Sequence, residues 1–174
     1  PGSVRGPYHR FSRTDSWLGA NVSAEADADL FWDNDGFRNL EPPFDVSDHD
    51  GMDDGYLGGT FVNCQPSTFS YRATIVGPAT QRYFNAWFDF NKDGDWEDVI
   101  QCPDGTLVYE WAVQNQPIGF GPGSYTITTP SFTPYLPAAA NLMWMRMTLT
   151  RQEQPPVNPS TSRPDGRGPD PGYV

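Results

Sequence analysis

Apolar and polar residues alternate with a period of two along several segments of the chain. Residues 69–75 are the clearest case, with apolar side chains at every odd position and polar or charged side chains between them. This is the period of a β-strand, in which successive side chains point to opposite faces. Residues 82–90 carry aromatic rings on both faces and contain no strand-breaking residue, which predicts a central strand covered on both sides. Further strands are predicted at 106–113 and 124–129, between turn sequences rich in Gly, Asp and Pro.

Residues 138–154 are compatible with either a helix or a strand, because Ala, Leu, Met, Arg and Gln are good helix formers. The alternation favours a strand, since Met143, Met145 and Met147 would share one face and the residues between them the other. Several short strands separated by turns at intervals of about ten residues predict an all-β fold. We expect an antiparallel β-sandwich of the jelly-roll or immunoglobulin-like type, with long acidic loops.

Composition divides the chain into three parts. Residues 1–57 are rich in Asp and Glu, with short apolar islands suited to hold a long irregular segment against a core, and we expect no typical strands there. Residues 58–151 contain the alternating segments and are expected to form the sandwich core. Residues 152–174 contain six prolines, which predict an extended tail or linker. A length of 174 residues suits one domain, to which the acidic part also belongs.

Charge and composition exclude several classes of partner. The chain has 11 basic and 22 acidic residues, a net charge of −11. Nucleic acid is therefore not expected as a partner, because its binding requires Lys and Arg to replace phosphate counterions. No run of 18 apolar residues occurs, so we expect no membrane insertion. Gly and Pro are frequent, which disfavours long helices, while an aromatic content of 14% disfavours disorder.

The two cysteines, Cys64 and Cys102, lie far apart and lack the CxxC spacing of zinc or redox sites. A disulfide between them is the simplest interpretation, with two unrelated buried thiols as the alternative. A disulfide and few lysines are typical of a secreted protein, so we expect an extracellular or cell-surface location.

Residues 89–98 contain the strongest chemical signal. Ca²⁺ takes six to eight oxygen ligands, and a loop supplies several when carboxylates alternate with outward-pointing residues and a Gly permits a sharp turn. The expected ligands are Asp89, Asn91, Asp93, Asp95 and Asp98. A distant carboxylate such as Glu110 could instead complete the shell. Ile100 stands where an EF-hand has its bidentate Glu, so the sequence predicts a calcium loop built on a strand; a polar hairpin without metal is the alternative.

A second acidic cluster lies within residues 45–55, where alternating carboxylates precede a Gly and a carboxylate pair. We expect a second metal site here, with Asp48, Asp50, Asp53 and Asp54 as ligands. A solvated acidic loop is the alternative. His49 could bring zinc to the same segment, although a lone exposed histidine is the simpler interpretation. Residues 33–36 repeat the pattern in a shorter form, as a metal loop or only a turn.

Catalytic motifs do not occur: the chain has no HExxH, no GxSxG and no phosphate-binding glycine loop. We therefore expect no enzymatic activity. The alternative is a hydrolase that uses two carboxylates about 5 to 10 Å apart in a cleft. Aromatic residues near the loops could stack on a sugar; the candidates are Trp17, Trp32 and Tyr56, for which packing under a loop is the simpler role.

Residues 85–98, Asn-Ala-Trp-Phe-Asp-Phe-Asn-Lys-Asp-Gly-Asp-Trp-Glu-Asp, resemble the aromatic-Asp-x-Asn-x-Asp-Gly-Asp-Trp signature of the GEVED domain of large bacterial secreted and cell-surface proteins. Residues 48–55 resemble the acidic segment that precedes this signature, and 110–115, 144–149 and 165–173 are similar to later segments. The resemblance implies an extracellular, calcium-dependent β-sandwich without a catalytic role. We expect a structural or adhesive module of a bacterial surface protein, with a calcium-dependent carbohydrate-binding module as the alternative.

One difference from the family pattern concerns the Gly-Glu-(Val/Thr)-Glu-Asp-Tyr strand that would follow Tyr173 and does not occur in this sequence. A sandwich without an edge strand exposes backbone groups with which another chain can pair. We therefore expect neighbouring subunits as partners, assembled by strand addition into a filament. Polysaccharide is the other expected partner.

Overall fold

The structure is a computed structural model that describes residues 15–22, 55–92, 96, 98–136 and 143–153. Within these ranges the chain forms nine strands, paired in antiparallel fashion, and no helix. The strands are β1 (Ser16–Leu18), β2 (Tyr56–Thr60), β3 (Thr68–Ile75), β4 (Arg82–Asp89), β5 (Val99–Gln101), β6 (Leu107–Tyr109), β7 (Trp111–Ile118), β8 (Gly123–Thr128) and β9 (Trp144–Thr150). The predicted all-β class is confirmed, and the part of the chain described here contains no helix long and apolar enough to cross a membrane.

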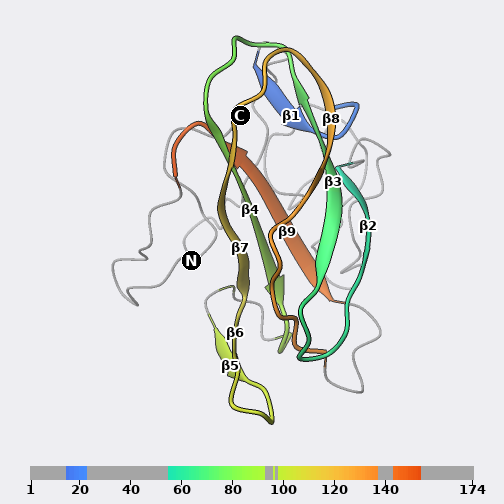
Figure 1. The fold of residues 1–174 in the computed structure, drawn as a ribbon, viewed down its shortest axis with the longest axis vertical. Coiled ribbons are helices and arrows are strands. Elements are labelled where there is room, and N and C mark those ends of the chain that lie inside the picture. Colours follow the sequence, from blue (N-terminus) through green and yellow to red (C-terminus); the bar gives the residue numbers. More distant parts are fainter. Residues whose placement is uncertain (1–14, 23–54, 93–95, 97, 137–142, 154–174) are drawn as a thin grey trace, which may run out of the picture.

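The first sheet is centred on β3 (Figure 1). Strand β8 pairs along one edge of β3. Strands β1 and β2 share the other edge end to end, with Leu18 opposite Ala73 and Tyr56 opposite Tyr71. Both β1 and β2 fit along this edge because β3 has eight residues, whereas β1 has three and β2 has five. This arrangement gives a four-stranded sheet.

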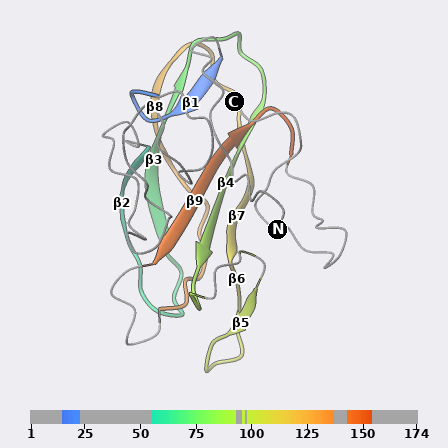
Figure 2. The ribbon, with the colours of Figure 1, turned by 180° about the vertical axis from the view of Figure 1, so that it is seen from behind.

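The second sheet places β4 between β7 and β9, as Figure 2 shows from behind. Phe84 and Phe88 of β4 are at most 1% exposed on one face, and Asn85, Trp87 and Asp89 at most 2% on the other. The central strand covered on both sides that the sequence predicts at 82–90 is therefore confirmed. Its lack of polar alternation is the pattern expected of a strand buried on both faces.

The core lies between the two sheets, where the alternating apolar residues of β3 meet those of β4. The rings of Tyr71 and Phe84 stack with centroids 3.7 Å apart, and Phe69 meets Phe88 edge to face at 6.1 Å. Each fully buried apolar side chain contributes about 1.5 to 3 kcal/mol to folding. Two antiparallel sheets that share this core are consistent with the predicted β-sandwich.

Strand β9 confirms that alternation outweighs helix propensity in this segment. Met145 and Met147 lie opposite Phe88 and Ala86 of β4 and pack against the core. A helix would have dispersed the methionines around its axis, whereas the strand directs them all to the apolar side.

The single strand predicted at 106–113 is in fact two, β6 and β7, which separate at Glu110. The backbone N–H of Glu110 donates to Asp98 O at 3.1 Å, whereas its carbonyl accepts the N–H of Phe88 at 2.9 Å. The chain therefore changes partners at this residue, from β5 to β4. Strands β5 and β6 form a separate hairpin that extends beyond one end of the two larger sheets (Figure 1).

The expectation that residues 1–57 lack strands is corrected at Ser16–Leu18, which form β1. Three residues are too few to reveal a period of two, and they are ordered by the end of β3 that β2 leaves unpaired. Strand β2 spans the expected boundary between residues 57 and 58. Most of the acidic N-terminal part and of the Pro-rich tail lies outside the described residues.

The disulfide expected between Cys64 and Cys102 is present, with Cα atoms 5.9 Å apart. Cys64 follows β2, and Cys102 lies in the turn between β5 and β6. The bond therefore attaches the β5–β6 hairpin covalently to a loop of the first sheet.

Candidate metal centre

The candidate calcium loop leaves the end of β4 and returns at the start of β5. Asp89 is the last residue of β4, and Asp98 immediately precedes β5. Strand β4 therefore positions the carboxylate of Asp89, and the β5–β6 hairpin positions that of Asp98. Asp93 and Asp95, two further expected ligands, lie outside the described residues.

The side chains of Asn91 and Asp98 meet across the two stems of this loop. The amide Nδ2 of Asn91 donates to Oδ2 of Asp98 at 2.5 Å. Asp89 lies two residues before Asn91, and its side chain is buried with 2% of the residue exposed. The fold therefore brings two of the five ligands expected from sequence, Asn91 and Asp98, into contact at one end of the second sheet, and places Asp89 at the end of β4.

Glu110 lies beneath the loop and is fully buried. Its Oε1 accepts the backbone N–H of Phe90 at 2.9 Å, and its Oε2 accepts that of Asp98 at 3.1 Å. Burial raises the pKa of Glu110 to about 7, against an ordinary 4.5. The two amide hydrogen bonds oppose this shift, whereas the negative charges of Asp89 and Asp98 add to it.

Trp96 attaches the loop to the outer face of the second sheet. The guanidinium carbon of Arg146 on β9 lies 4.6 Å from the centre of the Trp96 ring. On the same face the rings of Trp87 and Trp111 stack with centroids 5.7 Å apart. An arginine and an aromatic ring at this distance attract one another by a cation–π interaction.

The donor chemistry of the loop fits a hard cation. Carboxylate and amide oxygens are the ligands that Ca²⁺ takes, and both thiols of the chain are consumed in the disulfide. Among the described residues, however, no three His, Cys, Asp or Glu side chains form a group that could hold a metal. A calcium shell at this loop would therefore include ligands from the remaining residues of the 89–98 segment.

The other residues singled out from sequence are distributed as follows. The second acidic cluster and Trp32 lie outside the described residues; its expected ligands are Asp48, Asp50, Asp53 and Asp54. Trp17 lies in β1 and is 8% exposed, so its ring is packed within the protein and offers little surface to a ligand. Tyr56 is 38% exposed at the start of β2.

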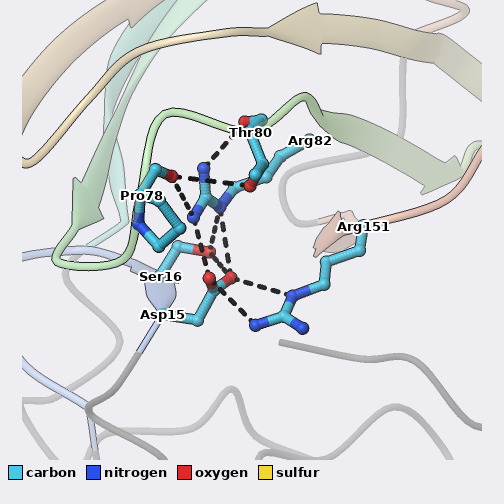
Figure 3. Close-up of polar contacts among 6 residues, drawn as sticks. All are labelled: Asp15, Ser16, Pro78, Thr80, Arg82 and Arg151. Carbon is cyan, nitrogen blue, oxygen red and sulfur yellow. Dashed lines mark hydrogen bonds and ion pairs between the residues drawn. The ribbon is translucent and has the colours of Figure 1, made fainter.

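An ionic cluster around the buried pair of Asp15 and Arg82 was not predicted from sequence (Figure 3). Asp15 Oδ1 lies 2.8 Å from Nη2 of Arg82 and 3.0 Å from Nη2 of Arg151. Ser16 accepts the N–H of Arg82 Nε at 2.8 Å, and the carbonyl of Thr80 accepts that of Nη1 at 2.9 Å. Burial alone would raise the pKa of Asp15, but hydrogen bonds from both arginines and Ser16 outweigh it, and the pKa lies below its ordinary value. The only sequence signal was a charged residue, Arg82, at the start of a strand rich in aromatic residues.

The model of the GEVED domain family matches residues 83–170, which begin in β4 and include the 89–98 loop and β9. The chain matches no curated protein and no solved structure. The family match covers half of the chain and contains the segment whose side chains gather at the loop. By this match the chain belongs to the GEVED domain family.

Proposed function

We propose that the protein is an extracellular calcium-binding β-sandwich module with a structural or adhesive role in a bacterial surface protein, and that Ca²⁺ binds in the 89–98 loop. The observation that carries this proposal is the hydrogen bond between Asn91 and Asp98, which joins the two stems of one loop, with Asp89 at the base of the first stem. Asp93 and Asp95 are the further ligands expected from the sequence.

The local electrostatics support a cation at this loop. The negative charges of Asp89 and Asp98 both raise the pKa of Glu110, so each of them repels the ionised carboxylate of Glu110 at the end of the second sheet. A divalent cation bound by the loop would offset this repulsion. Calcium suits such a loop better than Mg²⁺, because it accepts more ligands and tolerates irregular geometry.

The extracellular location is supported by the Cys64–Cys102 disulfide, because such bonds persist in oxidising environments. A structural or adhesive role requires a partner, for which we propose strand addition by a neighbouring subunit. Among the described strands, β2 and β8 each pair only with β3, so each is a candidate edge for an added strand. Light scattering over a range of concentrations tests this part: association supports it, and a monodisperse monomer at high concentration contradicts it.

Thermal unfolding tests the calcium proposal most directly. The midpoint is measured in EDTA, in millimolar Ca²⁺ and in millimolar Mg²⁺. A ligand that binds only the native state stabilises it by about 2.7 kcal/mol at a hundred times its dissociation constant. For a domain of this size that corresponds to an increase of several degrees. An increase specific to Ca²⁺ supports the proposal, and equal midpoints in all three buffers contradict it.

A further inference from the structure

Glu110 is connected to both stems of the 89–98 loop by its main chain and its side chain alike. On the β4 stem, its carbonyl accepts the N–H of Phe88, and its Oε1 accepts that of Phe90. On the β5 stem, its N–H donates to the carbonyl of Asp98, and its Oε2 accepts the N–H of Asp98. Each carboxylate oxygen is thus assigned to one stem. Glu110 therefore joins the two stems through both oxygens of one buried carboxyl group, in addition to the Asn91–Asp98 hydrogen bond.

We propose that Glu110 is a positioning residue that sets the spacing of the two stems, and thereby of Asp89, Asn91 and Asp98, for the cation. This inference rests on the proposed calcium function for its effect on binding, but the connection between the stems exists without it. It also assigns Glu110 a role different from that of a ligand completing the shell.

The chemistry of the two hydrogen bonds requires a glutamate. A carboxylate has two acceptor oxygens and can receive both backbone N–H groups at once, whereas the amide of Gln has one acceptor and one donor group. Gln therefore preserves the volume of the side chain but leaves one N–H facing another donor. Asp would retain both acceptors on a side chain one methylene shorter.

The position of Glu110 between β6 and β7 explains why the loop depends on it. Strand β6 belongs to the β5–β6 hairpin and β7 to the second sheet, so the two stems of the loop belong to different sheets. No regular ladder joins β4 to β5 among the described strands. The bonds of Glu110 supply that connection together with the Asn91–Asp98 hydrogen bond. A change in the Glu110 side chain can therefore alter the geometry of the loop while both sheets stay paired.

Amide hydrogen exchange in EDTA tests the connection without any metal. In Glu110→Gln, the backbone amides of Phe90 and Asp98 should both exchange faster than in wild type. For at least one of the two, the rate should rise roughly tenfold. The amide of Phe88 is an internal reference, because it bonds to the main-chain carbonyl of Glu110, which the substitution leaves in place. Glu153→Gln, at an exposed glutamate, is the matched control and should change neither rate.

Calcium titration of the same variants tests positioning. Disturbing a residue that orients metal ligands commonly weakens binding by about 10- to 100-fold, and we expect this for Glu110→Gln but not Glu153→Gln. Unchanged exchange at Phe90 and Asp98 in a folded Glu110→Gln protein overturns the inference. So does wild-type affinity in that variant. A wild-type chain that binds no Ca²⁺ refutes the proposed function instead, while the exchange rates still decide whether Glu110 joins the stems.

If Glu110→Gln fails to fold, Glu110→Asp provides the second variant. It keeps the charge and both acceptors, and the shorter side chain should lengthen at least one of the two hydrogen bonds. Relative to wild type, we expect faster amide exchange at Phe90 or Asp98 and weaker calcium binding. Both changes should be smaller than those caused by Glu110→Gln. Wild-type exchange rates and affinity in this variant contradict the proposed spacing role.

Discussion

Asp15 and Arg82 form an ion pair, Oδ1 to Nη2 at 2.8 Å, in which neither side chain has more than 4% of its surface exposed. Asp15 immediately precedes β1 of the first sheet, and Arg82 opens β4 of the second, so the pair joins the two sheets at one end. Gly77 leaves room for this contact, since a Cβ there would lie 2.6 Å from Asp15 Oδ1. The sandwich is thus closed at this end by charge as well as by apolar packing.

Removal of one partner should destabilise the protein strongly. Asp15→Ala leaves the guanidinium of Arg82 buried without its counter-ion, and breaking such a pair costs about 3 to 5 kcal/mol. Arg151→Ala is the matched control, because that side chain is 61% exposed and its ion pair should contribute about 0 to 1 kcal/mol. Urea unfolding measures both. Similar losses for the two variants would contradict a dominant role for the buried pair.

Stability should also depend on the ionisation of Asp15. Its pKa in the folded protein lies below the ordinary 3.8, so the unfolded chain binds its proton more readily. The stabilisation is therefore complete above about pH 4 to 5 and is lost as the pH falls through the folded pKa. Thermal unfolding between pH 2 and 6 should show the gap between wild type and Asp15→Asn narrowing towards low pH. A constant gap would assign the effect of Asp15 to packing.

The disulfide should contribute substantially to stability. The disulfide joins residues 38 apart and thereby reduces the entropy of the unfolded chain. In the chain-entropy model this stabilises the folded protein by about 3 to 4 kcal/mol. The double variant Cys64→Ser with Cys102→Ser should therefore unfold at lower denaturant, and reductant should affect wild type but not this variant. Thiol titration of the native protein is the independent check, since two reactive thiols would exclude the bond.

Asp98→Asn should affect the stability of the protein differently in EDTA and in Ca²⁺. The substitution removes one of the negative charges that raise the pKa of Glu110, so in EDTA the folded protein should be unchanged or slightly more stable. In Ca²⁺ the same variant should be less stable than wild type, because an expected ligand has lost its charge. Thermal unfolding of the variant and of wild type in both buffers measures this difference. An equal loss in both would mean that Asp98 acts through the fold and not through the ion.

The sequence by itself determined the strands whose signal is local. Alternation at 69–75 and at the methionines of 143–147 predicted a strand from the local pattern, because a period of two sorts those side chains onto one apolar face. Aromatic rings on both faces of 82–90, with no strand-breaking residue, likewise predicted burial on both faces. The two cysteines made a disulfide the simplest interpretation, which the structure confirmed, and the signature at 85–98 already indicated the family.

Tertiary structure alone decided the features that depend on a distant partner. The strand expected at 106–113 divides at Glu110 because its backbone pairs with two different sheets, and nothing local marks that change of partner. Strand β1 exists because the edge of β3 extends beyond β2. Arg82 could be recognised as buried only once Asp15, 67 residues earlier, was placed against it. Edge pairing and charge compensation join residues that are far apart in sequence. They therefore depend on the tertiary structure and cannot be inferred from the local sequence pattern.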